Sequence, residues 1–161
     1  MLKIKFKKSL NLILIFSIFA IIFAFFIEYI LGHKPCNLCL VERIPYYLVI
    51  IIILFSLFLE KFLKISLIFI SIIFFLATLV SFYHFGIEQG FIEESLVCDL
   101  NIENSALTKE ALLNELKEKS ISCKDVTFTI FGLSLATINI FVSLILSVIT
   151  LKLFLNYEKN K

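Results

Sequence analysis

The sequence predicts an all-α membrane protein, a bundle of four transmembrane helices in a single membrane domain over residues 1–161. Its residues are 60% hydrophobic and 17% charged, with a mean hydropathy of +1.02. A soluble domain is usually about 45–50% apolar and about 25% charged. The apolar residues form four long uncharged runs, and all four cysteines lie between these runs. The formal net charge of +2 is too small to suggest nucleic acid, so no such partner is expected.

The four uncharged runs set the expected helices. A membrane-spanning helix needs about 20 residues, and the run Ser9–Ile27 has this length. We expect a retained helix rather than a signal peptide, because a signal peptide has a core of only about 7–15 residues. The run Ile44–Leu59 is too short to cross the hydrocarbon, so its helix is expected to begin earlier, with Pro45 in the first turn. The predicted helices span residues 9–31, 40–59, 65–84 and 126–151.

The distribution of lysines predicts which loops face outward. Nine of the 15 basic residues lie at the chain ends or between the second and third helices: Lys3, Lys5, Lys7, Lys8, Lys61, Lys64, Lys152, Lys159 and Lys161. Cytoplasmic segments carry the excess of positive charge, so both termini are predicted to be cytoplasmic and the loops 32–39 and 85–125 to lie outside. These outer loops contain all four cysteines: Cys36, Cys39, Cys98 and Cys123. Disulfides persist in oxidising outer compartments, so disulfides are expected there.

The second outer loop also predicts a short amphipathic helix, over residues 108–120. Thr108 can cap this helix, and Leu112, Leu113 and Leu116 form its apolar face. The segment is too short and too charged to span a bilayer. It is expected either to lie on the membrane surface or to pack on its own loop.

Cys36 and Cys39, the CxxC pair, are separated by two residues, a spacing typical of redox-active thiols. A haem attachment site would need His at position 40, which is Leu. A zinc site would need two more ligands. Cys98 and Cys123 are available, but the stretch between them does not resemble a zinc motif, so no metal site is expected. A purely structural disulfide is the weaker alternative for the CxxC pair, because such bridges usually close longer loops.

Arg43 follows Cys39 by four residues, which would place both on one face of a continuous helix. The positive end of that helix and the Arg43 charge would then favour a Cys39 thiolate. An arginine at the edge of the hydrocarbon is costly and usually has a partner or ligand, so Arg43 is predicted to bind one. The alternatives are snorkelling to the headgroups or pairing with Glu42. Glu28, near the outer end of the first helix, is expected to be an interfacial residue.

The second cysteine pair, Cys98 and Cys123, admits two interpretations. A disulfide between them would staple the loop and contribute about 3 kcal/mol. Alternatively, the pair exchanges electrons with other thiols through mixed disulfides. The presence of the CxxC pair elsewhere on the same face favours exchange.

Three polar residues lie near or within the apolar runs. His84 and Glu88 lie one helical turn apart, and could polarise a ligand carbonyl or accept a proton. Equally, they could mark a helix end, where the histidine caps carbonyl groups. Asn139, inside the fourth run, is predicted to make an interhelical hydrogen bond.

The CxxC pair belongs to a longer motif, Pro35-Cys36-x-Leu38-Cys39-x-x-Glu42-Arg43. Together with the cysteines of the second outer loop and the four helices, this motif resembles the DsbB family of quinone-dependent thiol oxidases. The resemblance implies a protein of the bacterial inner membrane with periplasmic cysteine loops. It also implies two partners, a periplasmic thioredoxin-fold oxidase resembling DsbA and a membrane quinone, either ubiquinone or menaquinone.

The resemblance further implies a role for each cysteine. The reduced partner would attack a Cys98–Cys123 disulfide and form a mixed disulfide with Cys98. Cys123 would then attack Cys36 in a Cys36–Cys39 disulfide and leave Cys39 as a thiolate beside a bound quinone. The chain would thus reoxidise the periplasmic disulfide donor and sustain disulfide formation.

Two further residues would contact the quinone in this interpretation. Arg43 would hold a quinone carbonyl, and His84 matches a family position near the quinone by a looser correspondence. Two other classes of function remain open. One is a membrane protein with purely structural disulfides, in which Arg43 would be dispensable. The other is a thiol reductase that carries electrons outward.

Overall fold

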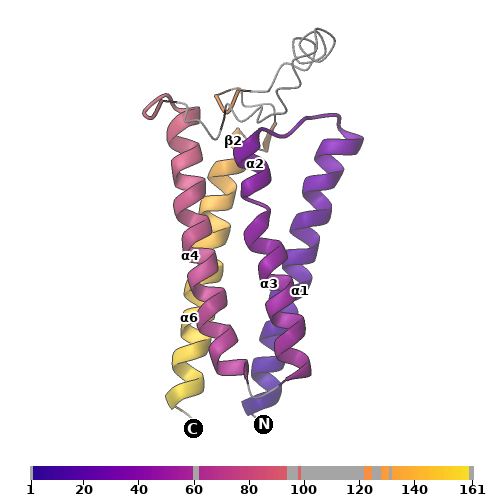
Figure 1. The fold of residues 1–161 in the computed structure, drawn as a ribbon, viewed down its shortest axis with the longest axis vertical. Helices are drawn as coiled ribbons and strands as arrows, with labels where there is room; N and C mark the ends of the chain where they lie inside the picture. The colour runs from indigo at the N-terminus through magenta and orange to yellow at the C-terminus, as the bar shows by residue number, and fades with distance from the viewer. Residues whose placement is uncertain are drawn as a thin grey trace, which may run out of the picture.

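The computed structural model describes residues 2–59, 62–93, 98, 122–124, 128–130 and 132–159. In chain order the elements are α1 (Leu2–Phe25), η1 (Phe26–Ile30), α2 (Asn37–Val41), α3 (Ile44–Phe58), α4 (Leu63–Glu88), β1 (Thr129–Ile130), β2 (Leu133–Ser134) and α6 (Leu135–Lys159). Among these described residues, four helical segments are long and apolar enough to cross a membrane: Phe6–Ile30, Asn37–Phe58, Leu63–Glu88 and Leu135–Tyr157. The predicted four-helix membrane fold is therefore confirmed. The start of α1 and the end of α6 lie at the same end of the bundle (Figure 1).

The bundle is assembled from two helix pairs. α4 packs on α6, α1 packs on α3, and a contact between α3 and α4 joins the pairs. Reciprocal hydrogen bonds tie α4 to α6, because Ser71 Oγ donates to the Ser147 carbonyl at 3.1 Å and Ser147 Oγ donates to the Ser71 carbonyl at 3.0 Å. Small hydroxyl residues are typical of helix contacts inside membranes, where they allow close approach and satisfy polar groups internally.

The outer surface of the bundle is strongly apolar. Leu12 is 69% exposed and Phe58 is 86% exposed, whereas Leu10 and Ile53 on the same helices are fully buried. Large exposed apolar side chains over whole helices suit a lipid environment rather than water. The chain is thus a multi-pass membrane protein, and buried polar residues such as Ser17, Ser81 and His84 lie inside the bundle.

The first membrane helix ends in the π-helical segment η1, where the Leu31 N–H donates to the Phe26 carbonyl at 3.2 Å. The predicted range 9–31 lies within the observed helix except at its last residue, and the helix begins earlier, at Leu2. Single turns of π-helix are found mostly inside α-helices and frequently at functional sites. Glu28 lies in η1, at the end of the bundle that carries the cysteines.

The second membrane segment is broken, which corrects the single helix predicted over residues 40–59. α2 ends at Val41, a turn follows at Glu42 and Arg43, and α3 begins at Ile44 with Pro45 in its first turn. The cause is Pro45, because it has no backbone N–H to donate to the Val41 carbonyl and its ring would clash there. The break separates α2 from α3.

α4 extends beyond the predicted end at residue 84 and stops at Glu88. Its end is fixed by Gly90, whose φ of +75° lies in the left-handed region that glycine adopts without strain. The chain then folds back, and the Phe91 N–H donates to the Gly86 carbonyl at 2.9 Å. A Cβ at Gly86 would lie only 2.6 Å from Cδ1 of Ile92, so glycine allows this close return.

The fourth membrane helix begins at Leu135, so the predicted start at residue 126 was wrong. In its place the chain forms an antiparallel hairpin, in which Thr129 pairs with Ser134 and Ile130 pairs with Leu133. An uncharged run cannot by itself separate helix from strand, and the β-branched and aromatic residues at 127–131 followed by Gly132 favour a hairpin. The predicted amphipathic helix over residues 108–120 lies outside the described residues.

Candidate functional site

A cavity of about 310 Å³ opens between α1, α2, α4 and α6. Small-molecule sites commonly measure about 300–1,000 Å³, with mostly apolar walls and a few polar groups. Phenylalanine, isoleucine and other apolar side chains form most of this wall. Its chemically reactive or charged lining residues include Cys36, Cys39, Glu42, Arg43, His84, Glu88 and Cys123. The cavity therefore suits an apolar ligand with a small number of polar atoms.

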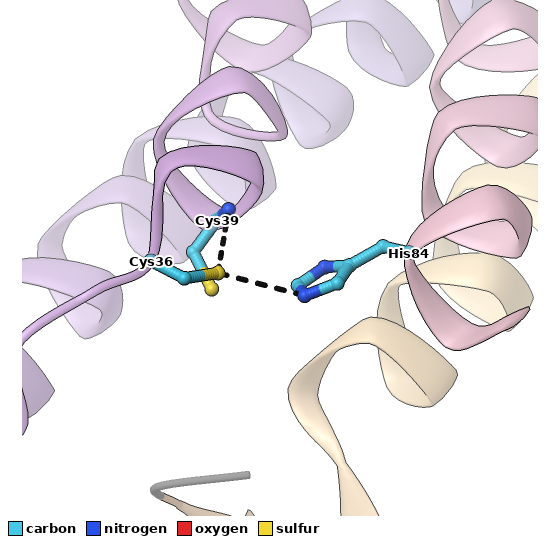
Figure 2. A group of neighbouring side chains, drawn as sticks. All are labelled: Cys36, Cys39 and His84. Atoms are coloured by element: carbon cyan, nitrogen blue, oxygen red, sulfur yellow. Dashed lines mark hydrogen bonds between the residues drawn. The ribbon is translucent and has the colours of Figure 1, made fainter. Parts of the chain in front are cut away.

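Cys36 is the N-cap residue of α2, and its sulfur accepts the Cys39 backbone N–H at 3.3 Å. The same sulfur lies 3.5 Å from Nε2 of His84 on α4 (Figure 2). A hydrogen bond from the Cys39 thiol is the largest influence on Cys36 and lowers its pKa, burial opposes this effect, and the hydrogen bond and charge of His84 reinforce it. The net result lowers the pKa of Cys36 to about 5. Both Cys36 and Cys39 are free thiols in this structure.

The stabilised thiolate is thus Cys36, whereas the sequence had favoured Cys39. The sequence argument required Arg43 and Cys39 to share one continuous helical face, but the chain breaks between α2 and α3. The N-cap position belongs to Cys36. The additional stabilising group, His84, comes from a different helix and could not be inferred from spacing.

His84 is buried and connects Cys36 to a carboxylate. Its Nδ1 lies 2.9 Å from Oε1 of Glu42, and Oε2 of Glu42 accepts a hydrogen bond from Asn139 Nδ2 at 3.1 Å. A nucleophile, an imidazole and an orienting carboxylate in this order form the usual arrangement for activating a nucleophile. The geometry allows a proton to move between the Cys36 sulfur and the imidazole.

Asn139 fixes this carboxylate by joining three membrane helices. Its Nδ2 also donates to Ser81 Oγ on α4 at 2.8 Å, and its Oδ1 accepts the Tyr46 hydroxyl of α3 at 2.6 Å. The interhelical hydrogen bond predicted for Asn139 is therefore confirmed. The network holds Glu42 in a defined orientation at the break between α2 and α3.

Arg43 lines the cavity and is held there by Glu28. Its Nη1 donates to Oε2 of Glu28 at 2.6 Å, and its guanidinium lies 5.4 Å from the centre of the Phe25 ring. The Arg43 side chain is only 13% exposed, so the observed pairing replaces both the snorkelling and the Glu42 alternatives. Glu28 was expected to be an interfacial residue, and the structure adds its ion pair with Arg43.

Glu88 forms a second carboxylate near His84. Its Oε1 lies 3.8 Å from His84 Nε2, one turn away on α4. Its Oε2 accepts the hydroxyl of Ser134, which caps the start of α6 by accepting the Thr137 N–H at 3.2 Å. The hairpin that delays α6 thereby brings Ser134 to Glu88. His84 and Glu88 belong to the cavity wall and not merely to a helix terminus.

Cys98 and Cys123 form a disulfide with a Cα–Cα distance of 5.9 Å. Both are buried in one cluster with Cys36, Leu38 and Ile87, and the Asn37 side-chain amide donates to the Cys98 carbonyl at 3.3 Å. The loop disulfide therefore packs directly on the α2 turn that carries the CxxC pair. This contact brings together two cysteine pairs that are far apart in sequence.

Comparison with known proteins agrees with this geometry. The family model described as "Disulfide bond formation protein DsbB" matches residues 7–153, nearly the whole chain. The chain belongs to the DsbB family. A protein of Rickettsia prowazekii (strain Madrid E), described as uncharacterized, is 34% identical over 156 residues, which cover 95% of this chain and 90% of that protein. No solved structure matches the chain significantly.

Membership in the DsbB family implies disulfide-bond formation through a redox relay in a membrane, and all four cysteines for such a relay are present. The structure brings the residues expected in a DsbB-type site together. One cavity is lined by Cys36, Cys39, Arg43, His84 and Cys123. Cys98 is bonded to Cys123.

Sequence reasoning did not predict the contacts of two carboxylates at or beside this cavity. Glu42 was noted only as part of the motif and as an alternative partner of Arg43, yet it orients His84. Glu28 is the true partner of Arg43. The sequence did offer one signal for both residues: each carboxylate lies inside or beside an apolar run, and such a group needs a partner in a membrane.

Proposed function

We propose that this DsbB-family chain reoxidises a periplasmic thioredoxin-fold disulfide donor resembling DsbA and passes the electrons to a membrane quinone, ubiquinone or menaquinone. The observation that carries the proposal is the packing of the Cys98–Cys123 disulfide on a reduced CxxC pair at an apolar cavity. In this function the chain resides in the bacterial inner membrane. Its lysine-rich ends are cytoplasmic and both cysteine loops are periplasmic, consistent with the lysine distribution.

Electrons enter through the loop disulfide. A thiolate of the reduced partner attacks Sγ of Cys98, forms a mixed disulfide and releases Cys123 as a thiolate. Cys123 lies at the cavity beside the CxxC pair. It attacks Sγ of Cys36 in a Cys36–Cys39 disulfide and releases Cys39 as a thiolate.

Two further exchanges complete the transfer. The second thiolate of the partner attacks its own mixed disulfide, leaves as a disulfide and releases Cys98. Cys98 then attacks Cys123 and releases Cys36, which restores the loop disulfide and leaves two electrons on the CxxC pair. Cys98 bonded to Cys123, with Cys36 and Cys39 free, is the distribution found here.

The cavity has the properties that a quinone requires. Its volume is within the range of small-molecule sites, its apolar wall suits the ring, and Arg43 places a guanidinium on the wall. A quinone bound there would supply a two-electron, two-proton acceptor. Arg43 would hold a quinone carbonyl oxygen and offset negative charge that develops there. His84, oriented by Glu42, holds a proton released from the Cys36 thiol.

A turnover assay on the purified chain in detergent tests the proposal. A reduced periplasmic thioredoxin-fold partner and a water-soluble quinone analogue are mixed, and quinone absorbance and partner thiols are followed together. We expect one quinone consumed per partner disulfide formed, with none consumed by the control variant Cys39→Ser. No consumption with all four cysteines paired would indicate structural disulfides, and net reduction of the partner by quinol would indicate an outward reductase.

Arg43→Ala is expected to raise the KM for the quinone analogue by roughly 10- to 100-fold and to change kcat less. A hydrogen bond from a charged donor contributes about 1.5–3 kcal/mol, and about 1.4 kcal/mol corresponds to a factor of ten. Glu28→Gln should give a smaller rise, because it only loosens the hold on Arg43. Lys34→Ala is the matched control, since Lys34 also places a positive charge at the cavity. An unchanged KM in Arg43→Ala would remove Arg43 from the quinone site.

A further inference from the structure

The reduced CxxC pair and His84 form a compact set of metal-ligand atoms. The two sulfurs and a nitrogen of His84 all lie within 4.8 Å of one another. In tetrahedral zinc sites the bonds measure about 2.3 Å to sulfur and about 2.0–2.1 Å to nitrogen, which places sulfur and nitrogen ligands roughly 3.5 Å apart. The Cys36 sulfur and Nε2 of His84 are 3.5 Å apart. The observed spacing already fits a shared cation.

The imidazole is held as metal-binding imidazoles usually are. Nδ1 of His84 contacts Oε1 of Glu42 at 2.9 Å, which leaves Nε2 directed at the cysteines (Figure 2). A carboxylate on the second ring nitrogen fixes the ring and increases its basicity as a ligand. Oε1 of Glu88 lies 3.8 Å from Nε2, so a carboxylate or water can complete the coordination. The loop cysteines are bonded to each other and leave this ligand set to the CxxC pair.

We propose that the reduced CxxC pair and His84 form a binding site for a thiophilic divalent cation such as Zn²⁺. Binding forms two metal–sulfur bonds and one metal–nitrogen bond, and any thiol proton still present leaves to solvent. No electron moves in this step. Thiolate and imidazole ligands select such a cation over Mg²⁺ or Ca²⁺, which take oxygen ligands.

The site exists only in the reduced protein, because closing a Cys36–Cys39 disulfide uses both sulfur ligands. A bound cation therefore opposes oxidation of the CxxC pair. In the proposed relay it would hold electrons on the chain and prevent their transfer to the quinone. The binding itself requires neither the partner nor the quinone, so its test is independent of the proposed function.

Cobalt(II) is the direct probe, because sulfur ligands give it characteristic charge-transfer absorption and tetrahedral geometry gives it intense visible bands. The full-length chain in detergent is reduced, freed of reductant without oxygen and titrated with Co²⁺. We expect binding of one equivalent and its displacement by Zn²⁺. Cys36→Ser and Cys39→Ser should each abolish the sulfur bands. Glu42→Gln should weaken binding by roughly 10- to 100-fold, and His84→Ala, which removes the ligand itself, at least as much.

Two matched control variants distinguish Co²⁺ binding at this site from binding by the other histidine or by the loop cysteines. His33→Ala removes the second histidine, whose ring contacts the Phe128 ring, and should leave Co²⁺ affinity unchanged. The double variant Cys98→Ser/Cys123→Ser removes the loop thiols and should bind as the wild type does. Thermal unfolding without metal shows which variants remain folded, and Zn²⁺ protection of Cys36 from alkylation provides a second measurement. Absence of sulfur-to-cobalt bands, dependence on the loop thiols, or full affinity in a folded His84→Ala protein would each overturn the proposal.

Discussion

The double variant Cys98→Ser/Cys123→Ser should lose all quinone reduction driven by the protein partner but retain quinone reduction driven by dithiothreitol. In the proposed relay the partner exchanges only with the loop disulfide, so its electrons then have no entry point. A small dithiol can instead reach the CxxC pair through the cavity, where Cys39 is partly exposed. The measurement compares the two initial rates of quinone loss on the same protein preparation.

The comparison separates a relay from a structural staple. A disulfide that closes a loop with a sequence separation of 25 contributes about 3–4 kcal/mol through chain entropy. If the disulfide is only a structural staple, its removal should lower thermal stability and depress both reactions together. If the disulfide is part of a relay, its removal abolishes only the partner-driven reaction. Partner-driven turnover at the wild-type rate in this variant would exclude the loop disulfide from the electron path. Cys36→Ser is the converse control, since it should stop both reactions.

The four membrane helices could be predicted because each needs only a long uncharged run, and length and charge are visible in the sequence. The CxxC pair could likewise be recognised from its spacing. The helix boundaries near Pro45 and Gly132 were harder to predict from the sequence. A proline inside a helical run breaks the helix at a preceding residue that depends on context, and a short apolar strand looks like the start of a helix.

The contacts of the site could not be predicted, because they join different helices. A soluble helix shows its buried face by an apolar stripe, but these helices are apolar on the lipid side as well. Nothing in the sequence then shows that His84 faces Cys36 or that Arg43 faces Glu28. The polar residues themselves were the usable signal, since each must find a partner inside the bundle.

His84→Ala should move the pH profile of Cys36 alkylation to higher pH and lower its rate at pH 6 by about tenfold. The pKa of Cys36 is lowered from 9.0 to about 5, first by the Cys39 thiol and then by His84, against the effect of burial. Wild-type Cys36 is therefore mostly thiolate at pH 6. Loss of His84 raises the pKa of Cys36 toward its ordinary value. For each unit by which this pKa exceeds 6, the thiolate fraction at pH 6 falls about tenfold.

The same shift sets the sign of the effect on stability. A group whose pKa is lowered by folding stabilises the folded state fully above its unfolded pKa, and this contribution is lost as pH falls through the folded pKa. The contribution of Cys36 to the stability of the reduced chain should therefore be lost as pH falls from about 9 to about 5, and this contribution should be smaller in a His84→Ala background. The contribution is isolated by comparing each protein with its Cys36→Ser counterpart. Thermal unfolding of the reduced proteins at a series of pH values measures the difference.

Alkylation with iodoacetamide in the presence of EDTA, read by mass spectrometry of the Cys36 peptide, gives the profile site by site. His33→Ala is the matched control, since His33 also lines the cavity but its ring contacts Phe128. Glu42→Gln should give an intermediate profile, because it leaves the imidazole in place while removing the carboxylate that orients it. An unshifted profile in His84→Ala would mean that the Cys39 hydrogen bond alone stabilises the Cys36 thiolate. The imidazole would then have no part in activating the CxxC pair.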